Sequence, residues 1–161
     1  MTTINLNLAC IEAIDITPAK LVIDKILEQL ASNSDDPAIS EPQLQFEILY
    51  PRELGDPREL SEIPEVRLWF VRLDALYPWL PYILDWRSGE LTRYAAMLVP
   101  HQFSSTDGIV FNPEALELFV MHKVFSISLW LKQRGIFNTA KLQQMTQSLG
   151  YEIDREFFNL L

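Results

Sequence analysis

The chain has 161 residues, of which 48% are hydrophobic and 22% charged. This predicts one compact domain, 1–161, and excludes a wholly disordered protein. The net charge of −9 lies in the first 65 residues, which hold 13 acidic and 4 basic side chains, whereas the rest of the chain holds 9 of each. This negative field repels phosphate groups, so neither nucleic acid nor a membrane surface is expected as a target. The acidic surface would attract a basic partner protein, or it is simply exposed to solvent without a partner.

The cysteine content and the lack of targeting signals indicate which cellular compartment and which kinds of site are compatible with this sequence. Cys10 is the only cysteine, which excludes an internal disulfide and a self-contained iron–sulfur cluster, since a cluster needs about four ligands. A reducing compartment is therefore expected. The sequence shows no secretory or transit signal, and its apolar runs are shorter than the ~20 residues of a membrane span. We expect a soluble intracellular protein.

The predicted elements begin with a strand over residues 4–16, where apolar side chains alternate with a period of two. A helix then starts at Thr17-Pro18, a cap followed by a proline in the first turn, and is expected to end near Ser32. Residues 33–42 are polar and predict a loop.

Three further strands are expected in the middle of the chain. Residues 44–49 alternate again, whereas 51–64 is irregular, with one helical turn capped by Asp56. Residues 66–74 are apolar on both faces, which is typical of a central strand. Residues 91–99 form the fourth predicted strand.

Two helices complete the predicted fold. The first opens with an asparagine and a proline and spans about 112–134, and the second spans about 138–150. The first carries two apolar stripes, so we expect it to be largely buried. The second of its stripes consists of Leu118, His122, Phe125 and Leu129. The predicted class is α+β, with a mostly antiparallel sheet of about four strands, packed helices and one long buried helix.

Residues 77–87, which we call the aromatic connector, join the last two predicted strands. They hold four aromatic rings and two prolines in 11 residues. Large rings on a stiff connector are typical of a partner-binding surface, although they would also serve as a satellite core over one end of the sheet. Nearby arginines either pair with the acidic first third or bind a partner's carboxylates. The predicted partner-binding residues are Trp79, Tyr82, Trp86, Arg87, Arg93 and His101.

The sequence carries little catalytic equipment. None of the five glycines stands in a phosphate-binding motif, and His101 and His122 lack the spacing of a metal site. We therefore expect no metal and no cofactor. His122 is predicted to pack inside the long helix and Cys10 to be a buried thiol. An enzyme would need a cleft formed by His101, Asp107 and Arg93.

Three stretches carry a family resemblance. They are RLWFVRLDALYPWLPY at 67–82, GELTRYAAMLVPH at 89–101 and NPEALELFVMHK at 112–123. Through them the chain resembles the chlororespiratory-reduction-six family of cyanobacteria and chloroplasts, over nearly its whole length. These strings identify kinship rather than a reaction, so no functional residue is carried over from the family.

The resemblance implies a non-catalytic assembly factor of the photosynthetic NAD(P)H dehydrogenase-like complex. Its implied partner, or client, is the ferredoxin-like iron–sulfur I subunit, which it would bind and help to mature or incorporate. The implied setting is the cytoplasm of a cyanobacterium, near thylakoids only through partners. In this hypothesis the aromatic connector covers apolar surface of the client. The alternatives are a small-molecule-binding sensor or stable accessory subunit, and an enzyme with a cleft around His101.

Overall fold

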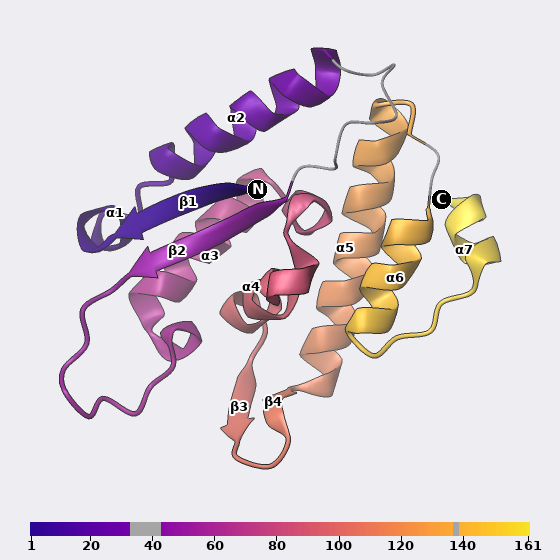
Figure 1. The fold of residues 1–161 in the computed structure, drawn as a ribbon. Coiled ribbons are helices and arrows are strands. Elements are labelled where there is room, and N and C mark those ends of the chain that lie inside the picture. The colour runs from indigo at the N-terminus through magenta and orange to yellow at the C-terminus, as the bar shows by residue number, and fades with distance from the viewer. Residues whose placement is uncertain (33–42, 137–138) are drawn as a thin grey trace.

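The structure, a computed structural model, describes residues 1–32, 43–136 and 139–161 (Figure 1). The predicted loop over 33–42 and the predicted cap Asn138 lie outside these residues. The α+β class is confirmed. In chain order the helices and strands are β1 (Thr2–Asn7), α1 (Leu8–Glu12), α2 (Thr17–Ser32), β2 (Leu44–Leu49), α3 (Pro64–Leu76), α4 (Glu90–Leu98), β3 (His101–Ser104), β4 (Gly108–Phe111), α5 (Pro113–Gln133), α6 (Ala140–Ser148) and α7 (Arg155–Leu160).

The prediction of a mostly antiparallel, four-stranded sheet is wrong. β1 and β2 pair in parallel, with Thr2 opposite Leu44, and β3 and β4 form a separate antiparallel hairpin. Parallel strands need a crossover connection, and α1 and α2 lie within it. Figure 1 shows the hairpin projecting from the body beside the start of α5.

The first strand is shorter than its alternating pattern predicts. Beyond Asn7 the chain turns into α1, because the Asn7 side chain accepts a hydrogen bond from the backbone N–H of Cys10 at 2.9 Å and caps the helix. Cys10 is half-buried on this short helix rather than buried on a strand. α2 agrees with its predicted bounds, and the Asp15 carboxylate accepts from the N–H of Thr17 at its start.

The two strands predicted over 66–74 and 91–99 are helices, α3 and α4. In α3 the buried side chains follow a helical period, and Leu68 and Val71 between them are exposed. The sequence is apolar throughout 66–74 because α3 carries apolar side chains on its exposed side as well as on its buried side, and not because it is a central strand. The buried side chains of α3 are Val66, Trp69, Phe70 and Leu73.

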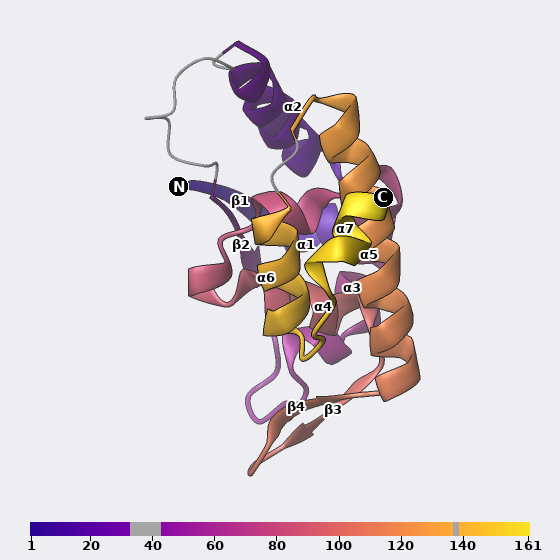
Figure 2. The same cartoon turned by 90° about the vertical axis from the view of Figure 1, so that its right-hand side faces the viewer.

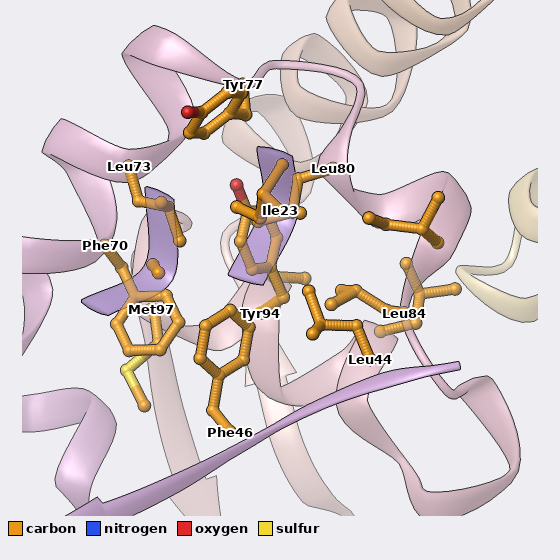
Figure 3. Packing of buried hydrophobic residues seen from close by; sticks show 14 of the residues in the cluster. Ile23, Leu44, Phe46, Phe70, Leu73, Tyr77, Leu80, Leu84, Tyr94 and Met97 are labelled. Atoms are coloured by element: carbon orange, nitrogen blue, oxygen red, sulfur yellow. The ribbon is translucent and has the colours of Figure 1, made fainter. Parts of the chain in front are cut away.

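The hydrophobic core is one cluster to which the β1–β2 pair and each of the seven helices in the described ranges contribute. At its centre the Phe46 ring of β2 meets Phe70 of α3 edge to face at 5.0 Å, and Phe70 meets Tyr94 of α4 at 6.0 Å (Figure 3). Edge-to-face pairs of this kind add to the burial energy of the rings. The contacts fix α3 and α4 against the buried face of the parallel strands.

An ion pair between a buried lysine and a half-buried aspartate joins α5 to this core. Lys123 is fully buried and its Nζ donates to the Asp74 carboxylate of α3, which also accepts from the Tyr94 hydroxyl at 2.7 Å. Burial lowers the pKa of Lys123, and the Asp74 charge opposes that shift. The pair therefore fixes the position of α5 relative to both α3 and α4.

The long helix is confirmed as α5, but the expectation that it is largely buried is wrong. Its Asn112 cap accepts from the N–H of Ala115 at 3.0 Å. One face, which includes Lys123, packs on the body, whereas the second apolar stripe faces solvent. His122 on that stripe is exposed, so its predicted packing is also wrong.

The remaining differences are local. The Asp56 carboxylate does not cap a helical turn; it binds the Arg58 guanidinium at 2.8 Å, which holds the pKa of Asp56 at about 2. A short 3-10 turn follows at Leu60–Glu62. The last predicted helix is confirmed as α6, and α7 was not predicted. No helix in the described ranges is long and apolar enough to cross a membrane.

Candidate partner-binding site

The aromatic connector links α3 to α4 through two 3-10 turns, Leu80–Ile83 and Trp86–Ser88. Leu84 forms a bridge with Leu44, and the N–H of Asp85 donates to the Leu44 carbonyl at 2.9 Å, so the connector is fastened beside β2. The backbone of the connector is therefore held by the sheet rather than left as a free loop.

Apart from the exposed Arg87, the side chains of the connector divide into a buried and a half-buried set. The half-buried set contains the three rings predicted to bind a partner, Trp79, Tyr82 and Trp86. They pack against the edge of the core and keep part of their surface exposed. The buried set is Tyr77, Leu80, Pro81, Ile83, Leu84 and Asp85.

The half-buried rings lie against α5 and α6. The Trp79 indole stacks on Trp130 of α5 with 4.5 Å between ring centroids and 13° between planes. The guanidinium of Arg134, the C-terminal cap of α5, lies 4.7 Å from the Trp130 ring. Lys141 of α6 places its Nζ 4.6 Å from the Tyr82 ring. These contacts hold the rings rigidly and place cations beside them.

We call this group the aromatic–cation cluster. Trp86 belongs to it because the Lys141 Nζ lies 5.2 Å from its ring, while the Trp86 indole N–H donates to the Pro81 carbonyl at 2.8 Å. The sequence analysis missed the members contributed by α5 and α6, which are about 50 residues from the connector. The cluster consists of Trp79, Tyr82, Trp86, Trp130, Arg134 and Lys141.

The three other predicted residues lie in different environments. Arg87 is exposed and borders the cluster in sequence. Arg93 is half-buried and donates to the Phe46 carbonyl at 2.9 Å and to Glu90 at 3.2 Å. His101 has its Nε2 3.1 Å from the Ser61 hydroxyl oxygen and its Nδ1 2.9 Å from the Val99 carbonyl. The side chains of Arg93 and His101 therefore form their hydrogen bonds with other residues of the same chain.

The residues of the alternative enzyme hypothesis make separate contacts. Asp107 is exposed in the turn of the β3–β4 hairpin, where its carboxylate accepts from the Ser104 hydroxyl at 3.3 Å. The hydrogen-bond partners of Arg93 and His101 differ from this one and from each other. A surface hollow of about 540 Å³ lies in the 50–58 loop and is lined by that loop. Within the part of the chain that the structure describes, no hydrogen bond or ion pair joins Arg93, His101 and Asp107 to one another.

Glu90 beside Arg93 supplies a pH-dependent prediction. Burial raises the pKa of Glu90 and outweighs the opposing Arg93 charge. A raised carboxyl pKa favours folding below the unfolded-state pKa, and this contribution is lost as pH rises through the folded-state pKa. Glu90→Gln is therefore expected to be more favourable for stability at pH 7 than at pH 4. Urea unfolding of both proteins at the two pH values tests this; an equal difference at both would contradict it.

One protein family matches the sequence in a comparison with family models. Its description is chlororespiratory reduction 6, and the match covers residues 6–160, nearly the whole chain. No solved structure matches the chain. The matched range contains the aromatic connector, α5 and α6, so every residue of the aromatic–cation cluster falls within it.

Proposed function

The chain belongs to the chlororespiratory reduction 6 family, and from this premise we propose that it is a non-catalytic factor that binds the iron–sulfur I subunit of the photosynthetic NAD(P)H dehydrogenase-like complex. The family suggests a role in the assembly of that complex. The I subunit as client, and its maturation or incorporation as the outcome, are the proposed steps.

The aromatic–cation cluster is the observation that supports binding. Partner surfaces gain most from large rings that are already ordered, because little conformational entropy is lost on association. Trp79 is ordered by its stack on Trp130, and Tyr82 and Trp86 share Lys141. The client surface that fits this cluster is apolar and bordered by carboxylates, which would pair with the exposed Arg87 and Arg134.

The proposed role is shielding rather than cluster delivery. A protein with one cysteine does not supply the four or so thiolates that hold a cluster. The client would keep its own ligands while a face that is later buried in the complex is covered. The acidic first third of this chain is proposed to attract basic regions of the client and raise the association rate.

Truncation of two rings tests the proposed surface. The double variant Trp79→Ala/Trp86→Ala is expected to weaken binding of the purified I subunit by about tenfold or more, since buried tryptophans dominate interface energies. Binding is measured anaerobically by titration. Leu54→Ala, which shortens an exposed side chain of the 50–58 loop, is the control and should bind as the wild type does. Unchanged affinity in a folded double variant would contradict the assignment.

The identity of the client is tested separately. Tagged protein purified anaerobically from a cyanobacterial lysate is expected to carry the I subunit without the rest of the complex. Recovery of the complete complex in fixed proportion would instead indicate a stable accessory subunit. If the tagged protein is recovered without any partner protein, with or without a bound metabolite, this would contradict the proposed function. A bound metabolite would favour the sensor.

A further inference from the structure

A stripe of α5 exposes large apolar side chains to solvent. Leu118 is 73% exposed, Phe125 51% and Leu129 59%. His122 stands between them and is exposed as well. We call these four residues the α5 seam. In Figure 2 α5 runs along one edge of the molecule. A contiguous apolar stripe of this kind on a rigid helix is typical of a protein interface.

The seam has the spacing of a coiled coil. Its residues are separated by four, three and four positions, which is the alternation of the two apolar positions in a heptad. The face that packs on the body lies on the other side of the helix and contains Val120, Val124 and Ile127. The α5 seam is therefore a second apolar face, separate from the face that packs on the core. Its spacing suits pairing with a second helix.

The charges at the two ends of the seam select the partner. Glu114 lies four residues before Leu118, Lys132 lies three residues after Leu129, and both are exposed. One end of the seam is thus acidic and the other basic. Two copies of α5 in antiparallel arrangement place Glu114 of each beside Lys132 of the other, whereas a parallel arrangement places like charges together.

The apolar residues match in the same arrangement. When two α5 helices run antiparallel about a two-fold axis, Leu118 of one faces Leu129 of the other, and His122 faces Phe125. From this agreement of apolar and charged positions we propose that the α5 seam is the interface of an antiparallel homodimer. The excess negative charge of the chain does not oppose it strongly, because residues 66–161 are electrically balanced.

The dimer leaves the proposed client surface uncovered. Trp130 lies about 110° around α5 from the centre of the seam, given about 100° per residue, and packs on the connector. The seam spans about three turns of helix, and the Phe157 ring of α7 lies 6.3 Å from the Phe125 ring and widens it. This is smaller than a standard stable interface, so a weak and reversible dimer is expected.

Sedimentation equilibrium of the full chain over a range of concentrations tests the dimer. Wild type is expected to dimerise reversibly, and Phe125→Glu to remain monomeric. Leu68→Glu on α3 is the matched control, because Leu68 is also an exposed apolar residue but lies outside the seam; it should dimerise as the wild type does. Circular dichroism checks that each variant is folded.

Charge exchange tests the antiparallel orientation. Glu114→Lys is expected to weaken the dimer by about tenfold, because it converts two attractive pairs into repulsive ones. The double variant Glu114→Lys/Lys132→Glu should restore wild-type affinity. A wild type that is monomeric at about 1 mM, or a dimer unaffected by Phe125→Glu, would overturn the proposal. If the wild type is monomeric and Phe125→Glu abolishes binding of the I subunit, the dimer is also overturned. The α5 seam would then be part of the surface that binds the client.

Discussion

Replacement of Asp74 by alanine is expected to lower the free energy of unfolding by about 3–5 kcal/mol. Lys123 is fully buried, and Asp74 is the carboxylate that compensates its charge. Without Asp74 the Tyr94 hydroxyl also loses its acceptor. The cost arises because a buried ammonium group and a buried hydroxyl are left without partners. Urea unfolding followed by tryptophan fluorescence measures it.

The asymmetry of the pair provides the control. Lys123→Met removes the buried charge and keeps a flexible side chain of similar length, so it is expected to change stability by less than about 1–2 kcal/mol. In the Asp74→Ala background the same replacement should recover most of the lost stability. If the double variant is as unstable as Asp74→Ala, the cost comes from the loss of side-chain packing at residue 74 and not from the uncompensated charge.

The features predicted correctly from the sequence are those that depend on neighbouring residues. Thr17-Pro18 and Asn112-Pro113 mark helix starts because a cap and a proline act within one turn, and both helices begin there. The alternation over 44–49 also predicts β2 correctly. The parallel partner of that strand could not be predicted, since pairing depends on a crossover that the local pattern does not specify.

The error over 66–74 has a different cause. Exposed Leu68 and Val71 fill the gaps in the helical pattern with apolar side chains, so the period of 3.6 disappears from the sequence. Pro64, at the first position of α3, was an available signal of a helix start. For 91–99 the Glu, Leu, Ala and Met content favoured a helix on propensity alone.

The candidate site was predictable only in part. The connector rings stand out locally, but Trp130 and Lys141 reach them through tertiary packing that no spacing rule describes. In the sequence the α5 seam is an apolar stripe, and such a stripe predicts a buried helix face. A sequence pattern shows that a helix face is apolar, but whether the same molecule or another one covers it depends on the fold.

Removal of the Trp69 ring is the second large effect expected. Trp69 is fully buried, meets the Phe70 ring edge to face at 5.1 Å, and donates its indole N–H to the Asp15 carbonyl at 2.8 Å. Trp69→Ala is expected to cost about 3–5 kcal/mol, as other buried aromatic truncations do. Trp69→Phe keeps a ring and loses the hydrogen bond, so about 1–3 kcal/mol is expected. Urea unfolding measures both.

The same series distinguishes a helix from a strand over 66–74. On α3 both Trp69 and Phe70 are buried although they are neighbours, because successive helical residues are only about 100° apart. Phe70→Ala should therefore be as costly as Trp69→Ala, whereas Leu68→Ala at an exposed position should cost less than about 1 kcal/mol. A strand would place Leu68 and Phe70 on one face and Trp69 on the other. The predicted central strand would bury both faces, so Leu68→Ala would then cost as much as Phe70→Ala. Similar costs for these two variants would contradict the helix.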